Sequence, residues 1–276
     1  HVFIGFKSGD SVTTASQSVA VGDEALGANT TGSANVAVGY NAGLAMTTAD
    51  NNVAVGFNCM VSTTTGTNNT AMGSRALDAH TTSHSNSCFG YAAGGNITTG
   101  QNNVALGSQA GISGSPGGSV TTGSNTILLG DENIAEANIQ VDWTVASDER
   151  DKTDFTALDL GLNFVNALEP FTYKWDKRAK YGNKLADDYD LNAQTPDGTH
   201  KEDWLDIGFK AQAVLALEEA AGYKIADKKN LTVSLTSDEK QYGLQYSKFI
   251  PILVKALQEA DDKIDALTTR IQALES

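Results

Sequence analysis

The feature that most constrains this chain is a glycine that recurs at every seventeenth position. Three small or apolar residues precede it, for example Val-Ala-Val at residues 19–21 and again at residues 36–38. This period is too short for a helical hairpin or a propeller blade, whereas it suits one coil of a β-solenoid. The glycines with this spacing are Gly5, Gly22, Gly39, Gly56, Gly73, Gly90 and Gly107.

Two further positions repeat together with the glycine. An asparagine lies four residues before it in five copies, and a pair of threonines lies nine and eight residues before it. The interval from Gly107 to Gly130, where the last copy ends, is longer by six positions, and residues 113–118 account for the difference as a loop insertion. The asparagines are Asn35, Asn52, Asn69, Asn86 and Asn103, and the threonine pairs begin at Thr13, Thr30, Thr47, Thr64, Thr81, Thr98 and Thr121.

Each coil is predicted to contain a short strand before the glycine, a second short strand near the threonine pair, and a turn rich in glycine and asparagine. The first strand is apolar on both faces, so we expect one face inside the coil and the other against another subunit. Trimerisation is the simplest way to cover that second face. Cys59 and Cys88 occupy alanine positions of the repeat, and they are predicted to be small core residues rather than functional thiols.

Residues 2–130 resemble the head repeats of trimeric autotransporter adhesins and the shafts of phage tail fibres. The resemblance rests on the Asn-x-Ala-Val/Leu-Gly core, although the period is longer than that usual in adhesin repeats. Regular threonines also suggest ice binding, but adjacent threonines on a strand point to opposite faces. A flat ice-binding surface needs threonines at alternate positions, so we interpret residues 1–130 as a trimeric β-solenoid shaft.

The charge and composition of the chain exclude several classes of function. Its net charge is −14; residues 1–130 hold two basic and five acidic residues, a net of −3, so −11 lies further on. Such a chain is expected to repel nucleic acid and anionic membrane, and without an 18-residue apolar run it is expected not to span a membrane. The two cysteines have no metal-ligand spacing, and we predict neither a metal nor a cofactor. His80, His84 and His200 lie in polar turns and are predicted to be surface residues.

A connecting segment, residues 131–146, follows the repeat. Ile139, Val141, Trp143 and Val145 alternate with polar residues, as in a strand with one buried face. We therefore predict a last β element that ends just before Ser147.

Residues 147–152 read Ser-Asp-Glu-Arg-Asp-Lys and place a serine and a lysine five residues apart. Three later motifs follow: Leu-Glu-Pro with alternating aromatic residues at 168–175, Ile-Gly-Phe-x-Ala-Gln at 207–212, and Leu-x-Tyr at 244–246. Together they resemble the intramolecular chaperone domain of endosialidases and other phage tail spikes, a self-cleaving peptidase family. The resemblance covers residues 147–276, whereas the Ser-Lys spacing alone is a weak signal.

The resemblance implies a dyad in which Ser147 is the nucleophile and Lys152 the base. A lysine can take the proton of a serine hydroxyl when burial lowers its pKa, and we expect other subunits to provide that burial. Asp148 and Arg150 would position the strained bond; the alternative is a solvated salt bridge. Asp151 departs from the family pattern, where an apolar residue is expected, and adds a carboxylate beside the base.

Two peptide bonds are candidates for cleavage. The resemblance implies the bond between Ser147 and Asp148. An N-to-O acyl shift through the serine hydroxyl would instead break the bond between Ala146 and Ser147. In either case the chain is at most a single-turnover enzyme that acts on itself.

The domain from residue 147 to residue 276 is predicted to be α+β. Residues 176–206 are polar and are predicted to form a long excursion that contacts the shaft or a neighbouring chain; the alternative is a mobile loop. Apolar spacing and turn residues predict helices over 155–168 and 211–221, and strands over 171–175, 207–209, 231–235 and 242–246.

The tail, residues 246–276, carries an a/d heptad seam with alternating spacings of three and four. We predict Ser247 as its N-cap, and Pro251 is tolerated in the first turn. The mixture of Ile and Leu alone favours a dimer, so three strands are expected from the shaft and the resemblance; an amphipathic partner-binding helix is the alternative. The seam consists of Ile250, Leu253, Leu257, Ala260, Ile264, Leu267, Ile271 and Leu274.

These features predict the C-terminal part of a homotrimeric viral tail fibre, which binds a host surface receptor and other tail proteins in the virion. Its chaperone domain would drive trimerisation and folding and then be released by autoproteolysis. One alternative is a trimeric bacterial surface adhesin with a retained trimerisation domain. Another is a glycan-degrading spike, which needs a catalytic domain before His1. Because the chain begins with His, we expect a processed form or a part of a longer protein.

Overall fold

The computed structural model describes residues 1–186 and 188–275, which divide into two compact units. The shaft unit comprises residues 1–135 together with two later pieces, residues 176–201 and 236–241. The C-terminal unit comprises the remaining segments from residue 136 onward. The chain therefore returns to the shaft unit twice after first leaving it.

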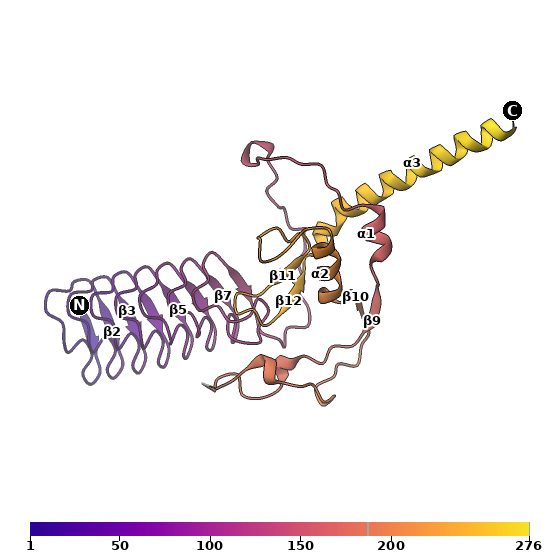
Figure 1. Ribbon diagram of the computed structural model, residues 1–276. Helices are drawn as coiled ribbons and strands as arrows, with labels where there is room; N and C mark the ends of the chain where they lie inside the picture. Colours follow the sequence, from indigo (N-terminus) through magenta and orange to yellow (C-terminus); the bar gives the residue numbers. More distant parts are fainter. Residues whose placement is uncertain (187, 276) are drawn as a thin grey trace. The chain divides into compact units, whose positions relative to one another are not determined.

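The shaft is a β-solenoid whose coils each contribute one three-residue strand to a single parallel sheet (Figure 1). The strands stand in sequence order, and each pairs with the next one residue for residue, so that Val19 faces Val36 and Ala20 faces Ala37. This confirms the predicted solenoid with a 17-residue repeat. The strands are β1 (Val2–Ile4), β2 (Val19–Val21), β3 (Val36–Val38), β4 (Val53–Val55), β5 (Thr70–Met72), β6 (Ser87–Phe89), β7 (Val104–Leu106) and β8 (Ile127–Leu129).

The central residue of each strand lies inside the coil. Ala20, Ala37 and Ala54 are fully buried there, and Cys88 takes the same position in β6. Burial raises the pKa of both cysteine thiols, Cys59 and Cys88, to about 12, which makes them poor nucleophiles. Both cysteines are therefore core residues, as predicted.

The repeated glycine is required by the close approach of successive coils. Gly22 has φ +131°, and a Cβ placed there would lie 2.5 Å from the carbonyl oxygen of Gly39. Gly39 and Gly56 stand in the same relation, at 2.4 Å. A side chain at this position would meet both backbone strain and a backbone clash.

The repeated asparagine forms a buried hydrogen-bond ladder along the solenoid. The backbone N–H of Asn52 donates to Oδ1 of Asn35 at 2.9 Å, and the N–H of Asn69 donates to Oδ1 of Asn52 at 3.0 Å. The Asn52 amide also donates to the carbonyl of Gly66 at 2.8 Å. Each asparagine thus satisfies backbone groups that no strand partner reaches.

The predicted second strand near the threonine pairs is wrong. The backbone N–H and the hydroxyl of Thr30 both donate to the carbonyl of Thr47, each at 3.0 Å, whereas the next residue, Thr31, is exposed. Four residues after Thr30, Ala34 adopts φ +56°, so the extended backbone ends before a ladder can form. The pairs therefore stack coil on coil without forming a second sheet.

The outer face of the parallel sheet is apolar and only partly covered in the single chain. The flanking valines of β2 to β4 are half-buried, whereas Phe89, Leu106 and Leu129 are exposed. Beside this face, the rings of Tyr40 and Phe57 stack with centroids 5.6 Å apart. The sequence expectation that another subunit covers this face stays a prediction.

The excursion after residue 175 contacts the shaft, which confirms one of its two predicted destinations. Residues 176–201 belong to the shaft unit, and Lys177 Nζ donates to the carbonyl of Glu132 at 3.0 Å. This part of the shaft unit contains the short 3₁₀ turns η2 (Arg178–Lys180) and η3 (Leu191–Ala193).

The C-terminal unit packs three helices against short antiparallel strand pairs. Its core consists of Leu160, Phe164, Val214, Val233, Phe249 and Ile252. Strand β9 pairs with β10, and β11 pairs with β12. The elements are η1 (Glu149–Asp151), α1 (Leu162–Ala167), β9 (Phe171–Tyr173), β10 (Asp206–Gly208), α2 (Ala211–Ala220), β11 (Val233–Leu235), β12 (Tyr242–Leu244), η4 (Tyr246–Lys248) and α3 (Phe249–Glu275).

Two elements predicted near the start of this unit differ in the structure. No strand forms over residues 139–145, because the segment is fully exposed and has no neighbouring strand with which to share hydrogen bonds. The helix predicted over residues 155–168 begins only at Leu162. Gly161 has φ −137° and ψ −136°, which is outside the helical region, so the helix cannot extend back through it. The backbone N–H of Leu162 instead donates to the carboxylate of Glu259.

The long helix α3 separates two apolar faces. Phe249, Ile252 and Ala256 are buried in the core of the unit, whereas the seam residues Leu253 and Leu257 are exposed. Ser247, the predicted N-cap, instead lies within the preceding turn η4. In Figure 1 the later turns of α3 extend beyond the other elements of this unit.

The prediction for His80 is also wrong, because this residue is fully buried. Its Nδ1 lies 2.7 Å from the Thr63 hydroxyl and its Nε2 lies 2.9 Å from the carbonyl of Ser83. Burial lowers the pKa of His80 to about 4. His84 is partly exposed and His200 is exposed.

No helix in the described part of the chain is long and apolar enough to cross a membrane. Among the same residues, no group of three or more His, Cys, Asp or Glu side chains could hold a metal ion.

Candidate functional site

A tight turn brings the predicted dyad together. The Asp148 carboxylate accepts a hydrogen bond from the backbone N–H of Arg150 at 2.9 Å, which caps the 3₁₀ turn η1. The backbone N–H of Lys152 then donates to the carbonyl of Glu149 at 3.1 Å and closes the turn. The side chains at the two ends of the turn therefore lie on the same side.

Ser147 and Lys152 are in direct contact. Lys152 Nζ lies 2.6 Å from Ser147 Oγ and 3.2 Å from the carbonyl oxygen of Ser147. That carbonyl belongs to the bond between Ser147 and Asp148. Both residues of the dyad are exposed in the single chain, so no surface of the same chain excludes water from them.

The neighbouring charges form a separate pair. Arg150 Nε and Nη2 donate to the two carboxylate oxygens of Asp148 at 3.0 and 2.6 Å. This guanidinium holds the pKa of Asp148 below its usual value. Ala146 lies just before Ser147, Asp151 is the last residue of η1, and both are exposed. The Asp148–Arg150 pair orders the turn, and both of its side chains are exposed.

The later motifs meet in one aromatic cluster of the C-terminal unit. Gly208 pairs with Phe171 in the β9–β10 ladder, and a Cβ on Gly208 would lie 2.4 Å from the Tyr246 hydroxyl. That hydroxyl accepts a hydrogen bond from the backbone N–H of Phe209 at 3.3 Å. The segments around Phe171, Gly208 and Tyr246 are distant in sequence but pack against one another here.

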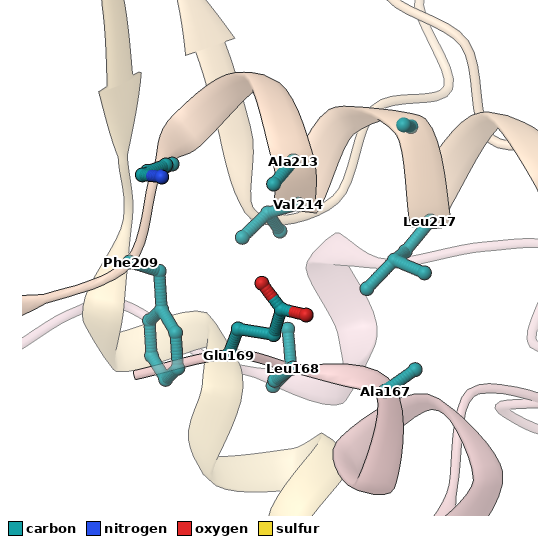
Figure 2. A pocket seen from close by; sticks show the side chains of 9 residues that line it. Ala167, Leu168, Glu169, Phe209, Ala213, Val214 and Leu217 are labelled. Carbon is teal, nitrogen blue, oxygen red and sulfur yellow. The ribbon is translucent and has the colours of Figure 1, made fainter. Parts of the chain in front are cut away.

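A shallow pocket lies between α2 and the segment before β9 (Figure 2). It has a volume of about 250 Å³ and is mostly apolar, with Phe209, Val214 and Leu217 among its walls. Figure 2 shows the carboxylate of Glu169 within it. Glu169 is the single carboxylate among its lining residues, whereas hydrolysis of a glycosidic bond ordinarily requires two.

Sequence reasoning missed a second polar site within the shaft unit. Glu132, Lys184 and Asp238 lie far apart in the sequence, yet they take part in contacts around the last coil. The six-residue insertion and the polar excursion were both visible signals. The excursion was expected to contact the shaft or a neighbouring chain, but its composition did not identify the insertion as the place of contact.

The comparisons with known proteins agree with the C-terminal motifs. Residues 147–223 match a family model described as the chaperone of endosialidase, and the match begins at Ser147. No curated protein and no solved structure matches the chain. The matched segment contains the Ser147–Lys152 turn, β9, β10 and α2. The chain thus joins a β-solenoid of 17-residue repeats to a segment, residues 147–223, that matches the model of the endosialidase-chaperone family.

Proposed function

We propose that this chain is the shaft-and-chaperone part of a homotrimeric viral tail fibre, and that it cuts itself at Ser147. The observation that carries the proposal is the 2.6 Å contact between Lys152 Nζ and Ser147 Oγ at the residue where the chaperone family match begins. The shaft would take part in host attachment. The domain after Ser147 would guide folding and association of three chains.

The proposed reaction is hydrolysis of one peptide bond. Lys152 takes the hydroxyl proton of Ser147, and the resulting alkoxide takes a proton from one water, whose hydroxide adds to the carbonyl carbon of the scissile bond. The C–N bond then breaks, the proton held by Lys152 goes to the leaving amine, and a carboxylate and an amine remain. Lys152 Nζ also contacts the Ser147 carbonyl at 3.2 Å, which favours the Ser147–Asp148 bond. Transfer of the Ala146 acyl group onto Ser147 Oγ, followed by hydrolysis of the ester, would instead free Ser147 as a new N-terminus.

Because the dyad is exposed in the single chain, we expect cleavage only after several chains have associated. A lysine acts as a base more readily after desolvation, because burial disfavours its charged form. Ser147 and Lys152 are exposed in the single chain, so the covering surface has to come from another subunit. Cleavage would then report that the trimer has formed.

Two apolar surfaces support association of identical chains. The outer face of the solenoid sheet includes exposed Phe89, Leu106 and Leu129. The seam residues of α3 are exposed except for the partly buried Ala260, with Leu257 72% and Leu274 85% accessible. A coiled coil buries such a seam between parallel helices.

The direct test compares wild type with the Ser147→Ala and Lys152→Ala variants on denaturing gels. We expect two fragments from wild type and one full-length band from each variant, because each variant loses one half of the dyad. Mass spectrometry of the fragments identifies the bond: a shaft fragment that ends at Ser147 indicates the Ser147–Asp148 bond, and one that ends at Ala146 indicates the acyl shift.

The Lys248→Ala variant provides a matched control, since it removes a lysine of the same domain that lies outside the dyad. It is expected to cleave like wild type. A single full-length band from assembled wild type would contradict autoproteolysis and leave a trimerisation domain that is retained, as in the adhesin alternative.

A further inference from the structure

The six-residue insertion of the last repeat lies against two segments that come from beyond Ser147. A Cβ on Gly114 would lie 2.6 Å from Cβ of Ala179, and a Cβ on Gly118 would lie 2.6 Å from Oδ1 of Asp238. Both glycines have positive φ, +88° and +73°. At its two points of closest approach, the insertion therefore has a residue without a side chain, in a backbone conformation that favours glycine.

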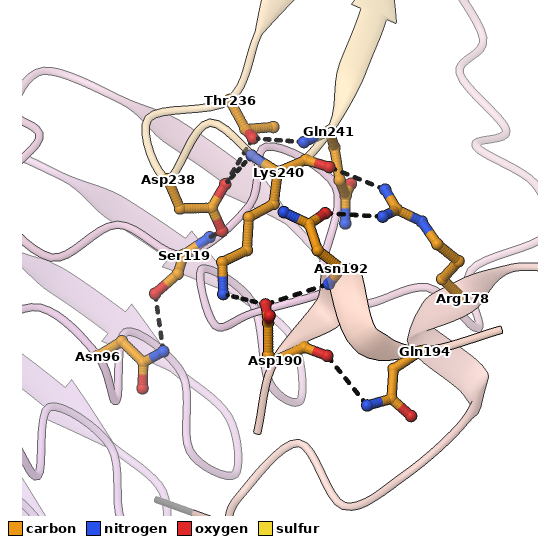
Figure 3. A network of polar contacts seen from close by, with 10 residues as sticks. All are labelled: Asn96, Ser119, Arg178, Asp190, Asn192, Gln194, Thr236, Asp238, Lys240 and Gln241. Carbon is orange, nitrogen blue, oxygen red and sulfur yellow. Dashed lines mark hydrogen bonds and ion pairs between the residues drawn. The ribbon is translucent and has the colours of Figure 1, made fainter. Parts of the chain in front are cut away.

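Hydrogen bonds fix the tip of the β11–β12 hairpin, residues 236–241, to Ser119, the residue that follows this insertion (Figure 3). The backbone N–H of Ser119 donates to Oδ2 of Asp238 at 2.8 Å, and the Ser237 hydroxyl donates to the carbonyl of Ser119 at 3.0 Å. Asn96 of the preceding coil donates to the Ser119 hydroxyl at 2.7 Å. The tip thus satisfies backbone groups of the last coil.

The arm, residues 176–186 and 188–201, adds a buried ion pair. Lys184 Nζ contacts the Glu132 carboxylate, and the two side chains are only 9% and 7% accessible. Lys177 Nζ donates to the carbonyl of Glu132. Removing either partner of such a pair leaves an uncompensated buried charge, which is strongly unfavourable.

The arm and the tip also bind each other. Lys240 Nζ of the tip pairs with the Asp190 carboxylate of the arm at 2.8 Å. Arg178 donates to the carbonyl of Lys240 and to Oδ1 of Asn192, each at 2.8 Å. Figure 3 shows these side chains converging in one network. We call the arm and the tip together the cap.

We propose that the insertion at residues 113–118 is a docking platform for the cap, and that the cap holds the C-terminal fragment on the shaft after the chain is cut at Ser147. The cut itself rests on the proposed function. The chain passes between the two units five times, and a cut at Ser147 interrupts only the first passage. Both pieces of the cap belong to the C-terminal fragment, so cleavage removes a covalent link and leaves the docked surface intact.

The experiment tests whether the cap retains the C-terminal fragment without relying on autoproteolysis. In full-length Ser147→Ala protein, the recognition sequence of a specific protease replaces residues 138–145, which are exposed and outside the cap. After complete cutting with that protease, size-exclusion chromatography reports whether the two fragments migrate together. We expect co-elution at physiological ionic strength.

Variants of the cap test its contacts one at a time. Lys184→Met leaves the buried Glu132 carboxylate without its cationic partner, and Asp238→Ala removes the acceptor of the Ser119 N–H. After cutting, we expect each to weaken binding between the fragments, by about 100-fold or more for Lys184→Met. Arg75→Met, which removes an accessible ion pair with Asp78 in the middle of the shaft, is the matched control and is expected to retain wild-type binding.

The uncut variants show whether folding is intact, because each is expected to elute like uncut parent protein. Separation of the parent fragments immediately after cutting would overturn the proposal. Undiminished co-elution of both cap variants would overturn it as well, because retention would then come from other contacts. A wild-type chain that never cuts itself would contradict the proposed function and leave this result unaffected.

Discussion

At the scale of single residues, the shaft depends on the buried asparagines whose side chains hydrogen-bond from coil to coil. Asn52 bonds to the coil before it through Asn35 and to the coil after it through Asn69 and Gly66. The 17-residue repeat showed that these asparagines occupy equivalent positions in successive coils. Their role did not follow from the sequence, because an asparagine near a glycine is equally typical of a solvent-exposed turn.

Asn52→Ala is expected to destabilise the shaft by about 2–5 kcal/mol, because the Asn69 N–H and the Gly66 carbonyl lose their partners in a buried setting. Chemical denaturation followed by circular dichroism measures this change. Thr48→Ala, at an exposed position of the same repeat, is the control and is expected to change stability by less than about 0.5 kcal/mol. Equal stability of the two variants would contradict a structural role for the ladder.

His80 gives the shaft a stability that depends on pH. Its pKa of about 4 in the fold lies below 6.5, the value for an unperturbed histidine, because burial disfavours the charged ring. The unfolded chain therefore binds a proton more readily, so the contribution of His80 is complete above about pH 6.5 and declines as the pH falls toward 4. The full decline is on the order of 3 kcal/mol.

Asn29 occupies the equivalent position three coils earlier and bonds to the carbonyl of Gly32, as His80 bonds to that of Ser83. His80→Asn is therefore expected to fold and to lose this part of the pH dependence. Denaturation curves at pH 7 and pH 4.5 measure the difference, with His84→Asn as the control at a partly exposed position. A wild-type slope in His80→Asn would show that other groups cause it.

At the scale of elements, patterns with a partner nearby were predictable and patterns without one were not. The valine-rich strands formed because the next coil always presents the same register. The alternating segment at residues 139–145 has an equally clear pattern, yet it stays irregular because no strand edge lies beside it. The spacing of apolar residues indicates which face of a strand is suited to burial. Whether the strand forms depends on a neighbouring strand with which it can share hydrogen bonds.

The seam of α3 is the element whose partner is still to be identified. Leu257→Lys is expected to leave the single chain folded, because the side chain is 72% accessible, and to reduce self-association. Light scattering coupled to size-exclusion chromatography should give the mass of three chains for wild type and a smaller mass for the variant. Gln258→Lys lies next to the seam and is expected to retain the wild-type mass; an equal loss in both would argue against the seam as the contact.

At the scale of the whole molecule, the sequence predicted the order of the parts better than their connections. The solenoid, the Ser-Lys turn and the terminal helix all follow from local periods or short motifs. Contact of the excursion with the shaft was one of two expected destinations, whereas the return of residues 236–241 to the shaft unit was not expected, because docking between distant segments depends on shape and on single polar contacts. In the sequence, Gly114 and Gly118 indicated only that residues 113–118 form a loop insertion.

The uniform repeat has a mechanical consequence. Each coil bonds mainly to the coil before it and the coil after it, so a pulling force detaches coils one at a time rather than breaking the shaft as a block. Every detached coil releases one repeat of chain, roughly 55–60 Å when extended. Under tension the shaft would therefore lengthen in nearly equal increments and dissipate energy at each step, as a shock absorber does.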